Sequence, residues 1–319
     1  MVRICHLSDI HLPSMPTPAR GELQGKQWTG WTNWKRKRRH QSSMDVLDAL
    51  VAEARSQSPD HWALTGDLVN IALEGEMRNA KDWLRRLATP DKTSLVCGNH
   101  DAYMPNSLAM AAKLWGPWLA GEAEAFPTVG RDWKAFDAVY PLMQRVGDVA
   151  LISVNSGKPT PPFRATGLAS NAQLARLEVL LEELGEAGLC RVVLIHHPPM
   201  AKATHRHKRL IGAGRFRRVL QKAGAELVLY GHTHLDTVAA MAGPSAPIPC
   251  ICVPAAAQLP GHKRPPAAFN RLDIRRTGDA WTIDLMRIGL KADATPVAPF
   301  SFSTLHTQTF SLGSSGLSY

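Results

Sequence analysis

Five short apolar runs in this sequence are each followed at once by residues that can bind a metal ion. If the runs are central strands of an α/β fold, the polar segments emerge at strand ends, which is where such folds place their ligands. Three of the five segments open with glycine, a residue suited to tight turns and close backbone contacts. The sequence therefore predicts that seven donors from runs 2–5, 62–64, 94–97, 192–195 and 227–230 converge on one site: Asp9, His11, Asp67, Asn99, His196, His232 and His234.

The spacing and chemistry of these donors favour a centre with two divalent metal ions. In an extended segment, side chains two residues apart point the same way, so Asp9 with His11, and His232 with His234, could each face one cavity. Carboxylate, amide and imidazole ligands without a thiolate are typical of Mn, Fe or Zn sites, and the sequence does not distinguish these metals.

The rest of the chain alternates β-type runs with amphipathic helices, which predicts strands with helices packed on their faces. The clearest helix begins at Ser170, with a capping-box Gln173, and another is expected over residues 214–223 with Gly224 as its stop. We expect a single domain over residues 1–300, with a Trp-rich and basic insert at about 13–42. A Ser/Gly/Thr-rich C-terminal tail is expected over 301–319.

The five metal-binding segments resemble the pattern of the calcineurin-like metallophosphoesterases: Asp-x-His, Gly-Asp, Gly-Asn-His-Asp/Glu, His, and Gly-His-x-His. The resemblance extends to Gly167, to residues 154–156 and to residues 270–272, and so covers roughly residues 2–290. It implies a four-layer αββα sandwich with two mixed β-sheets, the metallophosphoesterase fold. It also implies a hydrolase of phosphoester bonds whose nucleophile is a metal-bridging hydroxide.

The resemblance assigns a role to each predicted ligand by its position in the pattern. One metal ion would be held by Asp9, His11, Asp67 and His234. The other would be held by Asp67, Asn99, His196 and His232, so that Asp67 bridges the two ions. His100, next to ligand Asn99, is the candidate catalytic residue, which either protonates the leaving alkoxide or stabilises charge on the phosphoryl group. Asp101 is expected to orient a neighbouring residue or to cap a turn.

Charge and cysteine content bear on partners and location. The net charge is +10, and the basic excess gathers at residues 35–39 and in the acid-free stretch 187–225, so we expect anionic substrates or partners. The five cysteines show no zinc-ribbon or Cys-x-x-Cys spacing and are expected to be buried and reduced. No signal peptide is visible, and we expect a cytoplasmic protein, with a peripheral position at the inner face of the membrane as the alternative.

Two further features bear on the substrate. His205, Arg206, His207 and Arg209 follow ligand His196 and are candidates to bind a second anionic group, unless they form a solvated loop. Trp28, Trp31 and Trp34 precede residues 35–39, and if helical they would suit an anionic membrane surface. Gly30, Thr29 and Thr32 weaken that helix, and tryptophans that pack the insert on the domain are an equal alternative.

These features leave three functions open. A phosphodiesterase acting on cyclic nucleotides or glycerophosphodiesters fits the complete motif set and is the first hypothesis. A peripheral-membrane lipid hydrolase similar to UDP-2,3-diacylglucosamine pyrophosphatase would explain the Trp-rich insert. A metal-dependent DNA nuclease would explain the basic surface, but nucleic acid is not expected as a partner because little chain remains after residue 290 for the capping domain that nucleases of this family carry.

Overall fold

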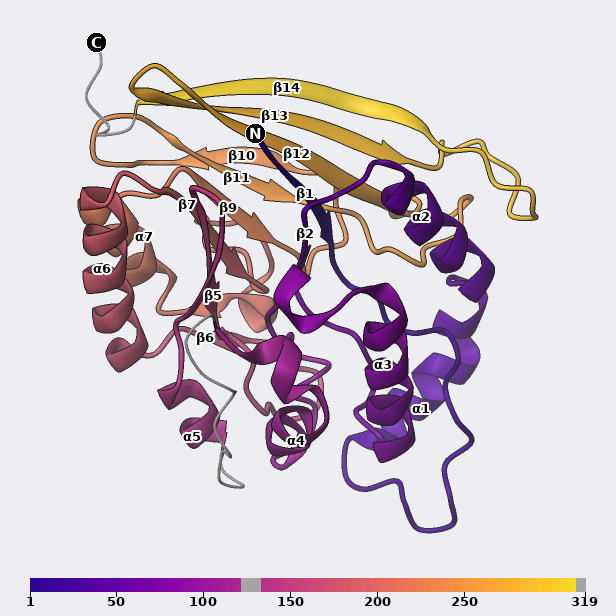
Figure 1. The fold of residues 1–319 in the computed structure, drawn as a ribbon. Helices are drawn as coiled ribbons and strands as arrows, with labels where there is room; N and C mark the ends of the chain where they lie inside the picture. Colours follow the sequence, from indigo (N-terminus) through magenta and orange to yellow (C-terminus); the bar gives the residue numbers. More distant parts are fainter. Residues whose placement is uncertain (122–132, 314–319) are drawn as a thin grey trace.

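Two six-stranded mixed sheets face each other in the computed structural model, which describes residues 1–121 and 133–313 (Figure 1). Strands β1, β2 and β3 of the first sheet run parallel, and its other neighbours are antiparallel. Its order is β14 (Ser303–Gly313), β13 (Ala280–Gly289), β12 (Ala268–Thr277), β1 (Val2–Leu7), β2 (His61–Leu64) and β3 (Thr93–Leu95).

The second sheet has a parallel centre with one antiparallel strand at each edge. Its order is β10 (Val238–Met241), β11 (Ile248–Cys252), β9 (Leu227–Tyr230), β7 (Cys190–Ile195), β5 (Val149–Val154) and β4 (Leu142–Val146). A small separate sheet pairs β6 (Gly167–Leu168) with β8 (Leu210–Ile211).

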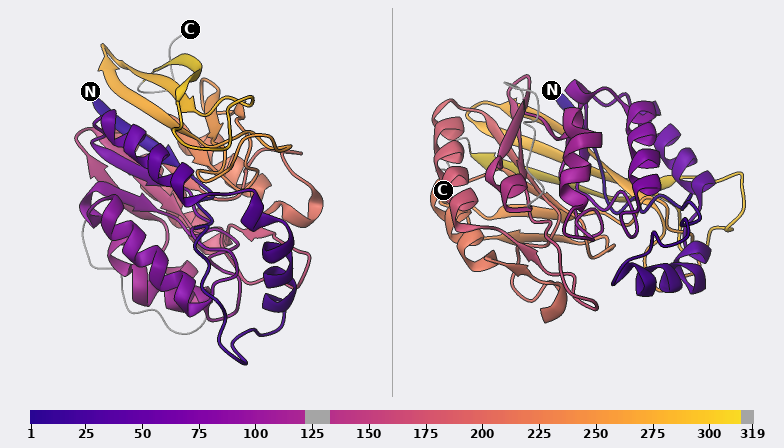
Figure 2. Two further views of the ribbon diagram at one scale, coloured as in Figure 1. Left: turned by 90° about the vertical axis from the view of Figure 1, so that its right-hand side faces the viewer. Right: turned by 90° about the horizontal axis from the view of Figure 1, so that it is seen from below.

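Helices cover the outer faces of both sheets, which gives the four-layer αββα sandwich predicted from the sequence (Figures 1 and 2). The first sheet packs on α2 (Met44–Ser56), α3 (Glu74–Leu87) and α4 (Ser107–Leu119). The second packs on α6 (Asn171–Glu186) and α7 (Ala213–Ala223), and the short α5 (Trp133–Ala138) lies below α6 in Figure 1. None of the helices in the described ranges is long and apolar enough to cross a bilayer.

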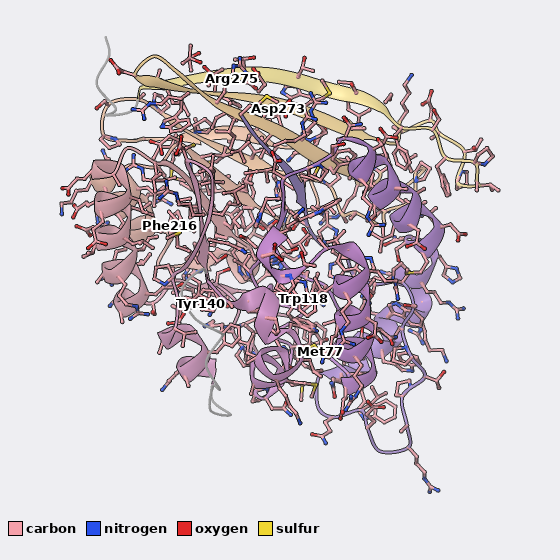
Figure 3. The ribbon with its side chains drawn as sticks, viewed as in Figure 1. Met77, Trp118, Tyr140, Phe216, Asp273 and Arg275 are labelled. Atoms are coloured by element: carbon pink, nitrogen blue, oxygen red, sulfur yellow. The ribbon has the colours of Figure 1, made fainter. Side chains whose placement is uncertain are left out.

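Three apolar layers hold the sandwich together. Phe216 lies on the α6–α7 side, and Met77 and Trp118 lie on the α3–α4 side (Figure 3). Between the sheets, Ile4 of β1 and Leu194 of β7 belong to the shared core. Strands with both faces buried are continuously apolar in sequence, which explains why the five runs were visible without alternation.

The chain after residue 300 corrects one expectation. Residues 303–313, predicted as part of a tail, form strand β14 and pair along nearly the whole of β13. The Ser and Thr residues that suggested a tail alternate with Leu305, Phe310 and Leu312, and Thr is itself a good strand former. Residues 314–319 of the expected tail lie outside the described part of the chain.

The Trp-rich insert forms a helix, α1 (Gln27–Arg36), followed by the short 3-10 helix η1 (Arg38–His40). Gly30 costs helix propensity, but a Cβ there would meet Ile71 and Tyr103 at 2.5 and 2.4 Å, so glycine lets α1 pack closely. Trp31 packs on the cluster of Leu23, Ile71 and Leu73, and its ring stacks on that of Trp34 at 5.2 Å. Trp28, by contrast, is 59% exposed.

Candidate metal centre

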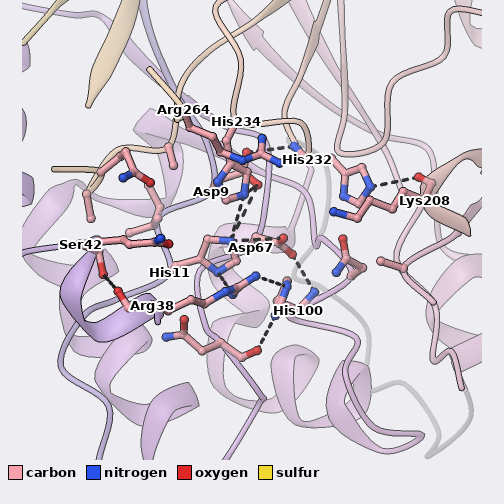
Figure 4. Close-up of a pocket in the computed structure, with 18 residues that line it drawn as sticks. Asp9, His11, Arg38, Ser42, Asp67, His100, Lys208, His232, His234 and Arg264 are labelled. Atoms are coloured by element: carbon pink, nitrogen blue, oxygen red, sulfur yellow. Dashed lines mark hydrogen bonds and ion pairs between the residues drawn. The ribbon is translucent and has the colours of Figure 1, made fainter. Parts of the chain in front are cut away.

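The seven predicted ligands follow the ends of strands β1, β2, β3, β7 and β9, which belong to the two facing sheets. All of them except His234 are buried, and all except His196 line a single cavity of about 170 Å³ (Figure 4). His196 adjoins the cavity through Asp67, with its Nε2 3.3 Å from Asp67 Oδ2. The strand-end argument from the sequence thus brings all seven to one place.

The backbone of this site differs from the extended segments that the spacing argument assumed. Five of the seven predicted ligands have positive φ angles, a region that costs non-glycine residues steric energy. The Asp9–His11 pair and the His232–His234 pair still each face one cavity, but through left-handed turns. These residues and angles are Asp9 (51°), His11 (41°), Asp67 (56°), His232 (67°) and His234 (54°).

One group of donors surrounds the carboxylate of Asp9. Its Oδ1 lies 3.1 Å from His234 Nε2, and the Nε2 atoms of His11 and His234 lie 3.4 Å apart. Asp67 approaches the same group, with Oδ2 3.7 Å from His11 Nε2. Oδ1 of Asp9 is buried and accepts no hydrogen bond among the described residues despite the nearby His234. An orphaned carboxylate oxygen between imidazole nitrogens fits a site for a cation.

A second group lies on the other side of Asp67. Nε2 of His196 is 3.3 Å from Asp67 Oδ2 and 3.3 Å from Asn99 Oδ1. The ring of His232 lies edge-on to that of His196, with centroids 5.1 Å apart. Asp67 therefore adjoins both groups, which is the arrangement required of a bridging ligand.

Three of the predicted ligand histidines each donate a hydrogen bond from one ring nitrogen to a backbone carbonyl. Nδ1 of His11 bonds to Val69 O at 3.0 Å, and Nδ1 of His196 bonds to Thr65 O at 2.6 Å. Nε2 of His232 bonds to Lys208 O at 3.0 Å. These bonds fix each tautomer and leave the opposite nitrogen free to bind a metal, a common feature of metal-ligating histidines.

Asp101 holds two ligand-bearing loops together. Its carboxylate accepts the backbone N–H groups of Asp67 (2.7 Å), Leu68 (2.8 Å) and Gly98 (2.8 Å), with a longer bond from Val69. Asp101 thus caps a turn, and through that turn it positions the predicted ligand Asp67, so both roles that the sequence allowed apply.

Two motif glycines are required by close contacts at the site. A Cβ on Gly98 would lie 2.1 Å from Asp67 Oδ1, and one on Gly231 would lie 1.8 Å from Ser8 Oγ. Any side chain at these positions would displace a ligand loop. The Gly-Asn and Gly-His motifs of the sequence therefore reflect packing around the carboxylates rather than turn geometry alone.

Electrostatic interactions are strong because the site is buried. Burial would raise the pKa of Asp67, but neighbouring His196 and His100 hold it well below the usual value of a carboxyl. Burial would likewise lower the pKa of His196, yet the carboxylates of Asp67 and Asp9 raise it to about 9. A cluster in which imidazoles and carboxylates perturb one another this strongly is typical of a functional site.

His100 faces the cavity through Nε2, because its Nδ1 donates to the carbonyl of Asn70. Arg38 Nη2 donates to that Nε2 at 3.0 Å, and Arg38 Nη1 lies 3.3 Å from His11 Nδ1. Burial and the charge of Arg38 lower the pKa of His100 to about 3, so the imidazole is neutral here. Its position suits a residue that acts on substrate, whereas its proton does not face the cavity.

Two other buried histidines near the site have structural partners. His197 bonds through Nδ1 to Ser156 Oγ at 2.8 Å. His6 bonds to the side chains of Thr65 (2.9 Å) and Asn270 (3.2 Å), and so supports the carbonyl that holds His196. The sequence gives no sign of this role of His6.

The four predicted substrate-binding residues lie at the surface. His205, Arg206, His207 and Arg209 are exposed, and the cavity lining includes Lys208 of the same segment instead. Arg38, Gln41, Ser42, Gln258 and Arg264 also line the cavity and were not predicted. Arg38 had been assigned to a solvent- or membrane-facing run, and nothing in the sequence distinguishes it from its basic neighbours.

Two mixed sheets between helices, with carboxylates, imidazoles and an amide converging at their strand ends, define a hydrolase of the dinuclear metal class. Residues 2–236 match the family model described as calcineurin-like phosphoesterase, and the chain belongs to that family. The protein is therefore a metal-dependent hydrolase of phosphoester bonds. No curated protein gives a significant match.

Solved structures share the fold at low sequence identity. A dimetal phosphatase from Danio rerio is 14% identical, with a TM-score of 0.58 over 88% of this chain and 95% of that one. The purple acid phosphatase PPD1 from yellow lupin (Lupinus luteus) is 11% identical, with a TM-score of 0.51 over 98% of this chain and 53% of that one. These likenesses confirm the predicted architecture.

Proposed function

We propose that the protein is a phosphodiesterase that acts on a small molecule. One observation carries this choice: the cavity continues on both sides of the ligand carboxylates. Figure 4 shows Ser42 on one side of Asp9 and Asp67 and Lys208 on the other. A phosphoryl group bound at the carboxylates would therefore have room for two substituents, which a diester carries and a monoester lacks.

We propose the metal ligands that the sequence pattern implied. Asp9, His11, Asp67 and His234 would hold one ion, and the distances around Asp9 Oδ1 support this set. Asp67, Asn99, His196 and His232 would hold the other, supported by the contacts of His196 Nε2. Two divalent ions in these places would lower the pKa of water and neutralise charge on the phosphoryl oxygens.

The chain's own residues then have defined tasks in the hydrolysis. The water oxygen bonds to phosphorus, the bond from phosphorus to the leaving oxygen breaks, and that oxygen takes up a proton. The carbonyls of Val69, Thr65 and Lys208 keep the ligand histidines oriented throughout. His100 lines the cavity beside the proposed ligands without being one of them, and Arg38 donates a hydrogen bond to its Nε2, so both would lie near a phosphoryl group bound there.

A substrate panel tests the proposal. We expect the protein loaded with Mn, Fe or Zn to hydrolyse bis-p-nitrophenyl phosphate with a kcat/KM at least about tenfold above that for p-nitrophenyl phosphate, a gap of about 1.4 kcal/mol in transition-state binding. Cyclic nucleotides and glycerophosphodiesters would follow as candidate natural diesters. A preference for the monoester would overturn the phosphodiesterase assignment.

The same panel decides between the alternatives. The exposed Trp28 is the observation that keeps a lipid hydrolase as a second candidate, although Trp31 packs on the domain and Trp34 stacks on Trp31. Hydrolysis of a UDP-sugar lipid without hydrolysis of soluble diesters would favour it. Degradation of labelled DNA with manganese would favour a nuclease, which a cavity of about 170 Å³ does not suit.

A further inference from the structure

Three positively charged side chains from distant parts of the chain line the metal-site cavity. Arg38 comes from η1, directly after the Trp-rich helix α1. Lys208 ends the 3-10 helix η3 (Arg206–Lys208), and Arg264 lies in the loop between β11 and β12. Figure 4 shows them around the carboxylates of Asp9 and Asp67. All three side chains are half-buried.

These cations have no acidic partner. Within residues 1–121 and 133–313, no carboxylate forms an ion pair with Arg38, Lys208 or Arg264. Burial lowers the pKa of Lys208, and the positive charges of Arg264 and Arg38 lower it further. The Lys208 ammonium is therefore close enough to both guanidinium groups to be repelled by them. Gathering like charges in a half-buried pocket destabilises the protein unless an anion binds there.

The phosphoryl group at the metal centre does not account for this charge. Two divalent ions beside the carboxylates of Asp9 and Asp67 already leave enough positive charge to balance a singly charged phosphodiester. Arg38, Lys208 and Arg264 add three more positive charges to the same cavity. The excess indicates that the substrate carries negative charge at a second place.

We propose that Arg38, Lys208 and Arg264 form a subsite for a second anionic group of the substrate, next to the scissile phosphate, and that Arg38 is its main specificity-determining residue. This inference rests on the proposed function and deepens it. A second phosphate or a carboxylate has the chemistry to bind there. A cyclic nucleotide, with a single phosphate, would leave the subsite empty.

Arg38 has this role because of where its guanidinium lies. It contacts His100 Nε2 at 3.0 Å and adjoins the ring of the predicted ligand His11 at 3.3 Å, at the border between the metal centre and the rest of the cavity. A planar guanidinium presents several N–H groups at once and binds phosphate or carboxylate in a bidentate manner. From this border Arg38 reaches an anionic group attached directly to the scissile phosphate.

The test measures binding of inorganic probes to the full-length, metal-loaded protein by calorimetry, because the metal centre must be present to hold the first phosphate. Free metal ion is buffered at a constant concentration so that pyrophosphate does not extract the bound ions. Inorganic phosphate supplies one anionic group, pyrophosphate supplies two linked phosphates, and phosphonoacetate supplies a phosphonate with a carboxylate. We expect both double anions to bind at least about tenfold more tightly than phosphate. Whichever of the two binds more tightly identifies the second group as phosphate or carboxylate.

Three variants assign the effect. R264Q should weaken pyrophosphate binding about tenfold and leave phosphate binding nearly unchanged. R38Q should also weaken pyrophosphate binding about tenfold, and by a larger factor than it weakens phosphate binding. R39Q is the matched control, since Arg39 is exposed, bonds only to its neighbour His40 and does not line the cavity. Arg264 lies in a surface loop outside the core, so R264Q keeps the test valid even if R38Q fails to fold.

The outcomes separate this inference from the proposed function. Equal affinities for phosphate and both double anions, or wild-type pyrophosphate binding by both R38Q and R264Q, would overturn the subsite even if the loaded enzyme hydrolyses diesters. Selective pyrophosphate binding that depends on Arg38 would uphold the subsite even if the diester panel fails. With loaded enzyme, R38Q should raise KM more for a doubly anionic diester than for bis-p-nitrophenyl phosphate.

Discussion

At the scale of single residues, His100 shows how a predicted role changes once its neighbours are known. The sequence offered it two roles, as a proton donor to the leaving group or as a residue that stabilises charge on the phosphoryl group. In the structure its Nδ1–H is given to the carbonyl of Asn70, and Nε2 accepts a hydrogen bond from Arg38. A neutral imidazole in that state orients the guanidinium and has no proton to offer into the cavity.

The variant His100→Ala tests which role holds. We expect kcat/KM to fall at least about tenfold, and by similar factors for an alkyl diester and for bis-p-nitrophenyl phosphate, because Arg38 would lose the atom that orients it. The metal content should stay at the wild-type level. A loss confined to the alkyl diester, whose leaving group needs a proton, would assign general-acid catalysis to His100 instead.

At the scale of elements, a buried polar chain ties the edges of the two sheets together. His61 at the start of β2 donates through Nε2 to Ser94 Oγ of β3 at 2.9 Å. Ser94 in turn donates to Gln144 Oε1 of β4 at 3.0 Å. Nδ1 of His61 is buried without a hydrogen bond in the described structure, and burial lowers the pKa of His61 to about 4.

The buried His61 makes the free energy of unfolding depend on pH. The unfolded chain takes up a proton on His61 below about pH 6.5, whereas the folded protein excludes it down to about pH 4, so stability falls as the pH is lowered across that window. The total loss from this group is roughly 3 kcal/mol. His61→Gln retains an N–H for Ser94 but cannot titrate, so its urea-unfolding free energy should fall less steeply between pH 6.5 and 4.

The comparison with wild type isolates this histidine, because the other buried histidines titrate equally in both proteins. Parallel stability curves for the two proteins would contradict this prediction, because they would show that His61 takes up its proton in the folded protein as readily as in the unfolded chain.

Elements also show what sequence can and cannot predict. The helix at α6 was predicted from Ser170, whose hydroxyl accepts the N–H of Gln173 at 3.2 Å. The other half of the capping box is absent, since the Gln173 side chain bonds to Asn155 beyond the end of β5. Local signals therefore placed the element, while a contact between residues distant in sequence decided what its side chain does.

At the scale of the whole molecule, the convergence of the seven candidate ligands could be predicted because they follow buried strands that are apolar on both faces. The residues that line the cavity could not be predicted in the same way, because they come from loops that meet only in the complete fold. Arg38, Gln258 and Arg264 carry no local pattern and meet only after the sandwich has formed. Sequence reasoning thus fixes the reaction class before the substrate.

Removal of the metals should leave this molecule folded. The ligand loops are held by hydrogen bonds from the protein itself, such as those to Asp101 and to the carbonyls of Thr65 and Val69. We expect chelation to abolish hydrolysis and to leave the far-UV circular dichroism spectrum unchanged. Tm should fall only as far as the lost free energy of metal binding requires. Unfolding at 25 °C after chelation would instead show that the metals hold the fold.

The Trp-rich helix α1 has a consequence for how this chain could diversify. Gln27 donates to Ile71 O at 3.0 Å and Lys26 donates to Thr160 O at 2.8 Å, so the insert is docked onto loops that it does not help to build. Arg38 belongs to the same insert, in η1 just after α1, and lines the cavity. A related chain that kept the sandwich and its metal centre could therefore acquire a different substrate if this one segment were replaced.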